Sequence, residues 1–217
     1  MNKGVNRKRA QQSTLNCCAR SCICRYCVVV YEKTMIKNRP RGLGKQGILH
    51  MLELRKMNYK DMVEQWKYVT ALPADENGLT NRYEGVSFDD YRDLVLPELI
   101  MHETPIDMPE WFVPETYYYL WDDDILIGEF RIRHYLTDAL KNGAGHIGYS
   151  IKKEFRGRGY GTKGLALTLS LAKKIVPEEE IYLRVLKNNI PSFKAIRNNG
   201  AYISGDDEKH YFMRIKK

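Results

Sequence analysis

The sequence predicts an α/β (α+β) fold in which a mixed sheet forms one layer and helices pack on its faces. Two observations carry this prediction. Short segments with the alternating apolar pattern of strands are interspersed with longer segments of helical periodicity, in the order βααβββαβαββ. Stretches rich in glycine, proline and aspartate separate them, and no internal repeat occurs in the 217 residues.

Each expected element follows from its local pattern. The expected strands are residues 51–57, 116–121, 125–136, 145–151, 181–186, 201–204 and 209–215. The expected helices are residues 59–72, 88–101, 159–174 and 190–198. Ser87 is a suitable N-cap for the second helix, which we expect Pro97 to end or kink. Residues 71–86 and 102–115 are expected to be loops.

Three consecutive aspartates, Asp122 to Asp124, lie between two expected strands. A carboxylate cluster is one way to bind a metal ion. Because aspartate is also common in tight turns, the position between two strands favours a solvated hairpin turn. We therefore expect no metal site.

The positive charge of the chain is concentrated near its beginning. Residues 1–50 contain eleven lysines or arginines and a single acid, Glu32, a net charge of +10. Residues 51–217 contain 24 basic and 26 acidic side chains, a net charge of −2. The total of +8 therefore describes the first segment, and we expect no nucleic-acid partner for the folded part.

All five cysteines also lie within residues 1–50, crowded between Cys17 and Cys27. A zinc site usually needs two pairs of ligands separated by a dozen or more residues, and this cluster has no second half. We expect residues 1–50 to be a disordered extension or a segment translated from upstream of the natural start, with Met51 as a natural initiator. The folded domain is expected to span residues 51–217.

No apolar run reaches the roughly 18 residues that a membrane-spanning helix needs. The apolar stretch at residues 27–31 is also too short for the core of a signal peptide. We therefore expect a cytoplasmic protein with no membrane partner.

Gly159, Gly161 and Gly164 have the G-x-G-x-x-G spacing of a dinucleotide-binding loop and lie between a strand and a helix. Backbone N–H groups in such a turn, together with the helix N-terminus, attract phosphate. The dinucleotide interpretation also requires an acid at the end of the next strand, where this sequence has Lys187 and two asparagines. That interpretation fails, and no P-loop motif occurs.

A different motif begins three residues before Gly159. The run from Arg156 to Gly161, RGRGYG, fits the pattern [Q/R]-x-x-G-x-[G/A]. With "HIGYSIKKEFRGRGYGTKGL" and "LKNNIPSFKAIRNNGAYIS", residues 51–217 resemble the GNAT superfamily of acetyl-CoA-dependent N-acetyltransferases, and "RIRHYL…GHIGYSI" is similar to a bacterial branch of predicted acetyltransferases. The resemblance implies a mixed, mostly antiparallel central sheet with helices on both faces. Gly164 is then a helix residue outside the motif.

The resemblance implies that acetyl-CoA is the co-substrate and binds where two neighbouring strands separate. Strand backbone would pair with its pantetheine arm, the glycine loop would hold its pyrophosphate, and Asn189 and Ser192 match positions that contact the pantetheine or the sulfur. The implied binding residues are Tyr149, Ser150, Ile151, Arg156, Gly157, Arg158, Gly159, Tyr160, Gly161, Thr162, Asn189 and Ser192. Lys163 and Lys194 are further cations near the phosphates.

The implied reaction is direct acetyl transfer to a primary amine in a ternary complex. An amine with a pKa of about 10.4 is mostly protonated at neutral pH, so a general base is useful. We expect His146 or Glu129 to be that base. The alternative for His146 is a hydrogen-bonded residue within the sheet.

One position departs from the family pattern. Many members have a tyrosine four residues after the position of Ser192, as the acid that protonates the departing thiolate, and this sequence has Ile196 there. Either Ser192 or Tyr202 protonates the sulfur, or no acid is needed because a thiol of pKa about 8.5 leaves readily as thiolate. Ile196 is also the best support for an alternative function, a non-catalytic acyl-CoA-binding or sensory module.

The sequence leaves the small-molecule or peptide acceptor open. Acids and an aromatic residue in the second loop would suit a cationic amine, namely Glu103, Asp107, Glu110, Trp111 and Glu115. Arg131, Arg133 and His134 would instead orient an anionic acceptor. A monomer and a homodimer are both compatible with the sequence. A nucleic-acid-binding protein driven by the basic segment is the third alternative.

Overall fold

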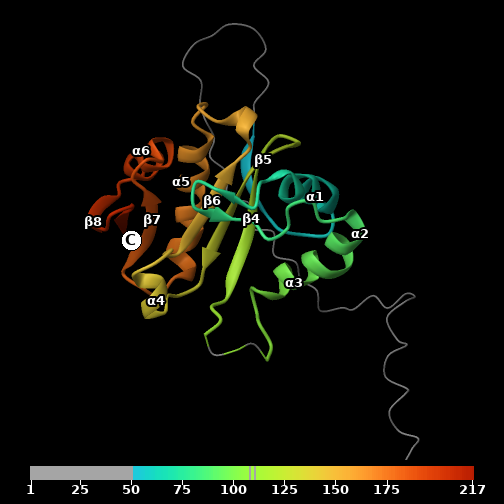
Figure 1. Cartoon of the computed structure of the whole chain (residues 1–217), viewed down its shortest axis with the longest axis horizontal. Helices are drawn as coiled ribbons and strands as arrows, with labels where there is room; N and C mark the ends of the chain where they lie inside the picture. Colours follow the sequence, from blue (N-terminus) through green and yellow to red (C-terminus); the bar gives the residue numbers. More distant parts are fainter. Residues whose placement is uncertain (1–50, 108, 110) are drawn as a thin grey trace, which may run out of the picture. The chain divides into compact units, whose positions relative to one another are not determined.

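The computed structural model describes residues 51–107, 109 and 111–217 of the chain (Figure 1). The basic, cysteine-rich residues 1–50 lie outside this range, so the expectation of a disordered or non-native extension stays a prediction. The fold prediction is confirmed: antiparallel strands form the centre and helices lie on both faces.

The strands form two main sheets. β1 (Leu52–Lys56), β4 (Glu115–Asp122), β5 (Ile125–Arg133) and β6 (Ile147–Ile151) pair in the order β1-β4-β5-β6. β7 (Glu180–Leu186), β9 (His210–Lys216) and β8 (Tyr202–Asp206) pair in the order β7-β9-β8. All of these ladders are antiparallel.

A single bridge, between Gly145 and Leu183, joins the two sheets where β6 and β7 begin to separate. The strand pairing of the expected layer is therefore interrupted at this point. The reason is local: the His146 ring accepts the N–H of Tyr182 (2.9 Å), so a side chain takes the place of the next backbone acceptor in the ladder. The separation of β6 and β7 opens the space described below.

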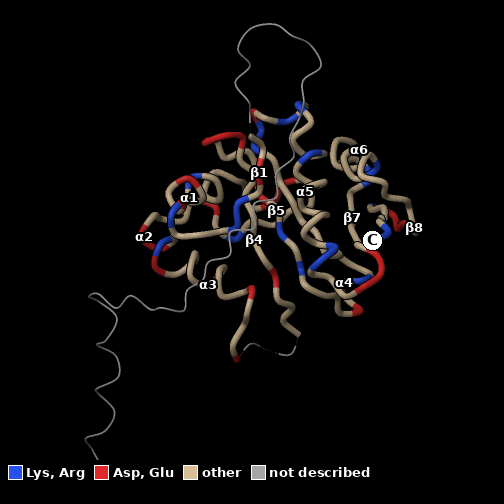
Figure 2. The backbone as a smooth tube through the Cα atoms, turned by 180° about the vertical axis from the view of Figure 1, so that it is seen from behind, with Lys and Arg blue, Asp and Glu red and all other residues tan. Residues whose placement is uncertain are grey.

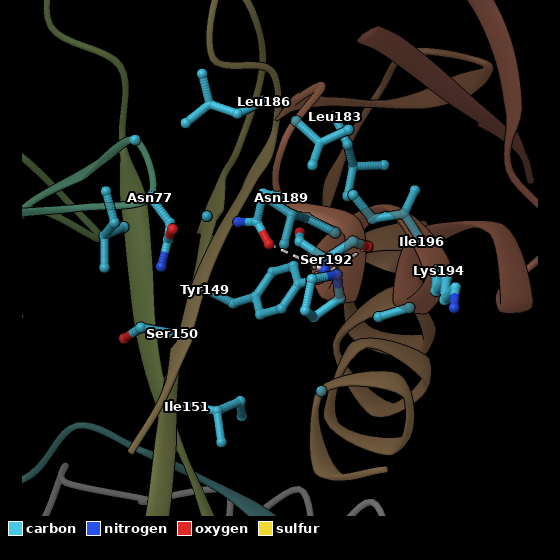
Figure 3. A pocket seen from close by; sticks show the side chains of 18 of the residues that line it. Asn77, Tyr149, Ser150, Ile151, Leu183, Leu186, Asn189, Ser192, Lys194 and Ile196 are labelled. Carbon is cyan, nitrogen blue, oxygen red and sulfur yellow. Dashed lines mark hydrogen bonds between the residues drawn. The ribbon is translucent and has the colours of Figure 1, made fainter. Parts of the chain in front are cut away.

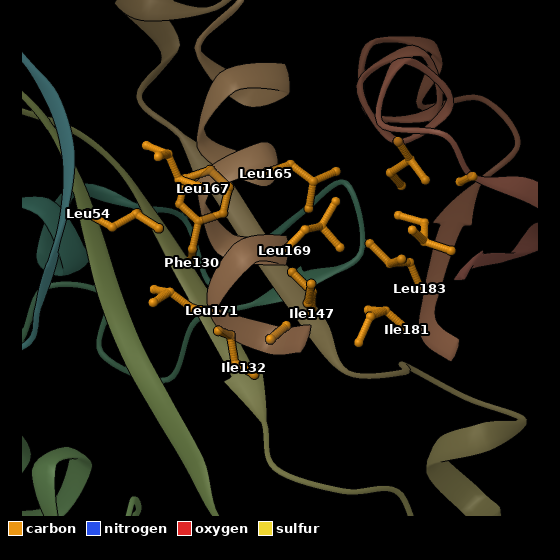
Figure 4. Close-up of a cluster of buried hydrophobic side chains, with 14 of the residues drawn as sticks. Leu54, Phe130, Ile132, Ile147, Leu165, Leu167, Leu169, Leu171, Ile181 and Leu183 are labelled. Carbon is orange, nitrogen blue, oxygen red and sulfur yellow. The ribbon is translucent and has the colours of Figure 1, made fainter. Parts of the chain in front are cut away.

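Helix α5 (Tyr160–Ile175) packs on one face of the sheets (Figure 4). Four leucines of α5 meet apolar side chains of β1, β5, β6 and β7, and all of them are buried: Leu54, Phe130, Ile132, Ile147, Leu165, Leu167, Leu169, Leu171, Ile181 and Leu183. Gly164 lies so close to β5 that a Cβ there would come within 2.3 Å of Phe130 Cζ. Gly164, a helix residue outside the phosphate-loop motif, therefore permits close contact between α5 and β5.

The opposite face of the first sheet is covered by α1 (Met62–Ala71), α2 (Phe88–Asp90), the π-helical segment η1 (Tyr91–Val95) and α3 (Leu96–Met101). Ser87 caps this run as predicted, accepting the N–H of Asp90 (3.1 Å). The helix does not end at Pro97. A proline inside a regular helix clashes with the carbonyl four residues earlier, and the wider π-turn directly before α3 relieves that clash.

Several short elements were not expected. β2 (Asp75–Glu76) and β3 (Leu79–Thr80) form a hairpin whose turn residues, Asn77 and Gly78, have φ of 55° and 83°. Asn-Gly is the standard sequence of such a turn. The remaining elements are α4 (Asp138–Lys141), the 3₁₀-helix η2 (Lys153–Phe155) and the predicted α6 (Ile190–Asn198).

The aspartate turn is confirmed, since β4 ends at Asp122 and β5 begins at Ile125. Acidic and basic residues are interspersed over the described backbone (Figure 2). No helix in the described ranges is long and apolar enough to span a membrane.

Candidate acetyl-CoA and acceptor site

A cavity of about 600 Å³ opens between the separating strands β6 and β7. Its walls are β6, β7, the loop and helix start at residues 155–162, the first turns of α6, and the β2–β3 hairpin. Figure 3 shows that Tyr149 and Ser150 of β6 point to opposite sides of their strand, Tyr149 toward α6. Most of the predicted cofactor-binding residues line this cavity: Tyr149, Ser150, Ile151, Arg156, Gly157, Gly159, Tyr160, Gly161, Thr162, Asn189 and Ser192.

The backbone of β6 has one edge free for a ligand. Arg133 N–H donates to His146 O (2.8 Å) and Lys152 N–H to Ile127 O (2.9 Å), so the even-numbered residues of β6 bond to β5. In an antiparallel ladder the alternate residues face away, which directs the backbone groups of Tyr149 toward β7. We expected the backbone of Ser150 to pair with the pantetheine arm, but its carbonyl oxygen accepts a hydrogen bond from Tyr68 Oη (3.1 Å).

The glycine loop lies at the end of the cavity next to the C-terminal end of β6. Gly157 and Gly159 have φ of 76° and 81°, a left-handed conformation that disfavours other residues. Gly159 is the N-cap of α5, whose 16 residues leave the first N–H groups without helical partners at the cavity wall. These donors and the helix dipole suit a phosphate group.

The two arginines of the motif behave differently. Arg156 lines the cavity, but its guanidinium makes a two-pronged ion pair with Glu76 of the hairpin (2.9 and 2.6 Å) and donates to Ile151 O (2.8 Å). Arg158 lies outside the cavity lining, with its guanidinium 5.7 Å from the centre of the Phe155 ring. The cation that lines the cavity from α6 is Lys194.

Asn189 and Ser192 lie next to the side chain of Tyr149, a residue that we expected to contribute only backbone groups to the site. Asn189 is the N-cap of α6 and accepts the N–H of Ser192 (3.2 Å). Ser192 Oγ is 2.9 Å from Tyr149 Oη, and the Tyr149 ring stacks on Phe130 at 5.3 Å. Burial raises the pKa of Tyr149, so its hydroxyl keeps its proton at neutral pH.

Three positions were considered in connection with protonation of the departing thiolate, and they differ in whether they present a hydroxyl group to the cavity. Ile196 is buried in the core and contributes only hydrocarbon to the cavity wall. Tyr202 is partly exposed on β8 and donates to Glu180 (2.7 Å), away from the cavity lining. Ser192 is the one of these three that presents a hydroxyl to the cavity, and it does so together with Tyr149.

His146 is fully buried and does not line the cavity. Its Nδ1 accepts from Tyr182 N–H (2.9 Å) and its Nε2 lies 3.2 Å from Glu178 Oε2, so both ring nitrogens are engaged. Burial lowers the pKa of His146, against the opposing effect of Glu178. The geometry is that of a hydrogen-bonded residue joining β6 to β7.

Glu129 lies on β5 directly opposite Ser150, on the sheet face that α1 covers. Burial raises the pKa of Glu129 to about 7, with Arg131 acting in the opposite direction. A carboxylate with that pKa is half ionised at neutral pH and can accept a proton. Glu129 itself does not line the cavity, but its strand partner Ser150 does, so Glu129 lies directly behind the cavity wall.

Arg131 and Arg133 follow on the same strand and line the cavity. Both approach one carboxylate, Glu115, with Nε to Oε2 distances of 3.4 and 3.7 Å. Burial would raise the pKa of Glu115, but His102 and the two arginines lower it to about 2. Sequence reasoning missed Arg184 of β7, which also lines the cavity and whose strand pattern marked it only as an outward residue.

The second expected loop does not line the cavity within the described residues. Glu103 pairs with Lys56, and Trp111 is 75% exposed. His134 contacts Thr116 Oγ1 (2.8 Å) instead of the cavity. Glu110 falls outside the described residues. The first loop does contribute, through residues 76–79 of the β2–β3 hairpin.

A family model and several solved structures that resemble this chain all describe acetyltransferases. Residues 53–202 match a family model described as "Acetyltransferase (GNAT) domain". A ribosomal-protein-S5-alanine acetyltransferase from Vibrio fischeri has a similar fold, with a TM-score of 0.56 and 15% identity over 76% of this chain and 92% of that one. A sequence comparison with curated proteins gave no match.

Two further solved structures were obtained with coenzyme A. A ribosomal L7/L12 α-N-protein acetyltransferase bound to coenzyme A has a TM-score of 0.55 and 16% identity, covering 76% of this chain and 93% of that one. A spermidine N-acetyltransferase from Vibrio cholerae bound to CoA and spermine has a TM-score of 0.51 and 16% identity, covering 76% and 95%. At such low identity these likenesses establish a shared fold.

Proposed function

Because the chain belongs to the GNAT acetyltransferase family, we propose that it transfers the acetyl group of acetyl-CoA directly to a primary amine while both are bound. The single observation that carries this proposal is the cavity between β6 and β7, with an unpaired strand edge along it and a glycine loop at one end. The glycine loop at one end of the cavity suits phosphates, and the unpaired edge of β6 along its middle suits an extended chain with amide groups. Coenzyme A has both of these features.

The residues present fit the cofactor. The N–H groups of residues 157–162 would hold the pyrophosphate, with Lys194 as the neighbouring cation. The Tyr149 backbone would pair with the pantetheine amides as one more strand does. A backbone N–H of β6 that polarises the thioester carbonyl would also stabilise the oxyanion formed when the amine attacks.

Glu129 is the general base of this proposal. Its pKa of about 7 lets it accept the amine proton at neutral pH, and it lies on the strand next to β6. His146 is better explained as the residue that fixes the start of the gap between β6 and β7, because both of its ring nitrogens are engaged. The transfer then forms an amide bond and breaks the thioester carbon–sulfur bond.

Tyr149 is our candidate for returning a proton to the departing sulfur. Its hydroxyl contacts Ser192 Oγ in the first turn of α6, four residues before Ile196. A hydroxyl from β6 thus reaches the part of α6 where relatives in the family carry the tyrosine that Ile196 replaces. Ser192 would orient that hydroxyl.

The experiment is detection of free thiol when purified protein is given acetyl-CoA and a panel of amines. Acetyl transfer predicts amine-dependent thiol release in proportion to acetylated product. The second candidate, a non-catalytic acyl-CoA-binding module, is favoured by Ile196 and predicts CoA binding without amine-dependent release. A cytoplasmic location and a monomeric or homodimeric state stay predictions.

A further inference from the structure

Three arginines gather at the end of the cavity that is remote from the glycine loop. Arg131 pairs by register with Gly148 of β6, and its Nη2 lies 3.5 Å from the place a Cβ at Gly148 would occupy. Arg133 is one pleat further along β5, and Arg184 faces the cavity from β7. They therefore surround the first half of β6 from two sides.

The protein compensates these three cations unequally. Burial lowers the pKa of Arg131, but the charges of Glu115 and Glu129 and the contact with Tyr117 outweigh burial and raise it. Arg131 and Arg133 share the carboxylate of Glu115, and Arg133 also donates to Gly145 O (2.9 Å). The side chain of Arg184 has no hydrogen bond or ion pair with any residue in the described part of the chain, although its backbone pairs with β9. Burial lowers the pKa of Arg133 to about 10, and the charge of Arg131 acts in the same direction.

Coenzyme A does not supply the missing negative charge in the proposed binding mode. Its phosphates would lie at residues 157–162, beyond the C-terminal end of β6. A strand advances about 3.3 Å per residue, so Gly148 is about 10 Å from Ile151 and farther still from the glycine loop. Arg184, whose side chain has no partner among the described residues, is therefore available to a different anion, and Arg131 and Arg133 add positive charge near it.

The carboxylates that would suit a cationic acceptor are not at this end. Glu76 is the acidic side chain among the described lining residues, and Arg156 already neutralises it. Glu115 is occupied by the two arginines, and Tyr117 Oη donates to it as well (2.6 Å). A polyamine would meet mainly positive charge here.

We infer that the acceptor is an amine that also carries an anionic group, a carboxylate or a phosphate, which Arg131, Arg133 and Arg184 bind at the N-terminal end of β6. This inference rests on the proposed acetyltransferase function. Glu129 is two residues before Arg131 on the same strand face, about 7 Å away along the strand. The base and the anion-binding group thus lie side by side, as a bifunctional acceptor requires.

The test compares acceptors that differ only in the anion. Thiol release from acetyl-CoA is measured with L-alanine against L-alaninamide, with phosphoethanolamine against ethanolamine, and with spermidine. We expect kcat/KM to be at least tenfold higher for the anionic member of one pair, and which pair shows it separates carboxylate from phosphate. Equal or better use of the amide, ethanolamine or spermidine would overturn the inference while leaving acetyl transfer intact.

A matched set of variants locates the effect. Arg184→Gln should raise KM for the preferred anionic acceptor about tenfold and leave KM for its uncharged partner unchanged, and Arg184→Lys should restore part of the loss. Lys209→Gln removes an exposed cation from the β8–β9 turn and is the control for net charge. An Arg184→Gln variant that affects both members of the pair equally, or neither, contradicts the assignment.

Titration calorimetry of the CoA-loaded protein with the same compounds gives a readout that needs no turnover. Tighter binding of the anionic member supports the inference, and equal binding of both members overturns it. Absence of CoA binding would instead refute the proposed function itself.

Discussion

Arg156 and Glu76 form a two-pronged ion pair across 80 residues of sequence, with both guanidinium–carboxylate contacts at or below 2.9 Å. The same guanidinium donates to Ile151 O at the end of β6. The arginine that opens the phosphate-loop motif therefore ties the β2–β3 hairpin to the loop. An arginine committed to two partners is poorly placed to be the main phosphate ligand.

We expect Glu76→Gln and Arg156→Gln to loosen the hairpin more than they weaken CoA binding. Hydrogen exchange at residues 75–80 should become faster in both variants, because each removes the same anchor. The Kd for CoA should rise less than about threefold, since the pair is partly exposed and such pairs contribute 1 kcal/mol or less. Glu154→Gln, a change at an exposed acid of the same loop, is the control. A tenfold loss of CoA affinity in Arg156→Gln alone would show that the arginine binds phosphate directly.

The contact between Tyr149 and Ser192 leads to a prediction about kcat. Tyr149→Phe removes the hydroxyl but keeps the ring stacked on Phe130, so the cavity shape should persist. We expect kcat to fall about tenfold, less than the roughly hundredfold or more usual for loss of an acid, because a thiolate leaves readily. The Kd for CoA should stay within twofold.

Tyr202→Phe serves as the comparison, since its hydroxyl bonds to Glu180 on the surface. It should leave kcat unchanged. A Tyr149→Phe enzyme with full kcat would mean that no acid is required for release of the thiolate.

Much of the fold could be predicted because it depends on local pattern. The order of strands and helices follows from apolar periodicity, and the glycine loop from a motif within six residues. The β2–β3 hairpin was missed although Asn77-Gly78 is a strong turn signal, because its strands are only two residues each. Propensity carries little information over so short a span.

The site was predicted less completely, because its side chains meet over long sequence separations. Glu76 reaches Arg156 and Glu115 reaches Arg131 only after the sheet has formed. Strand alternation places Tyr149 and Ser150 on opposite faces but does not say which face meets α6. Whether His146 faces a cavity or the core likewise depends on where β6 and β7 separate.

The raised pKa of Glu129 predicts a pH dependence of activity. As the general base, Glu129 must be ionised, so kcat/KM should rise with pH and level off above a pKa of about 7. Glu129→Gln should lower kcat/KM at least a hundredfold and remove this ionisation from the profile. His146→Gln should keep the profile while lowering stability, because it disrupts the junction of β6 and β7. If His146→Gln removed the ionisation from the pH profile and Glu129→Gln kept it, His146 would be identified as the base.

The same shift predicts an effect on stability with a definite sign. The folded state holds the Glu129 proton up to a pH of about 7, whereas the unfolded chain releases it near the ordinary glutamate pKa of 4.5. Wild-type stability should therefore fall as pH rises from 4.5 to 7, by about 3 kcal/mol. Glu129→Gln should match wild type at pH 4 and exceed it at pH 8 in urea denaturation. A variant less stable than wild type at pH 8 would show that the carboxylate makes a net favourable contact.

Gly164 provides a test of how α5 is held against the sheet. A Cβ at this position would lie 2.3 Å from Phe130 Cζ and 3.0 Å from Leu120 Cδ2, and both of these side chains are fully buried. Gly164→Ala gains about 1 kcal/mol in helix propensity, but overpacking of this kind costs 1–3 kcal/mol or more. We expect a net loss of about 2 kcal/mol in urea denaturation and a weaker affinity for CoA, because Phe130 stacks on Tyr149. Gly205→Ala, where no atom lies within 4 Å, should be close to neutral. If Gly164→Ala were as stable as Gly205→Ala, α5 would have room to move away from β5 without disturbing the core.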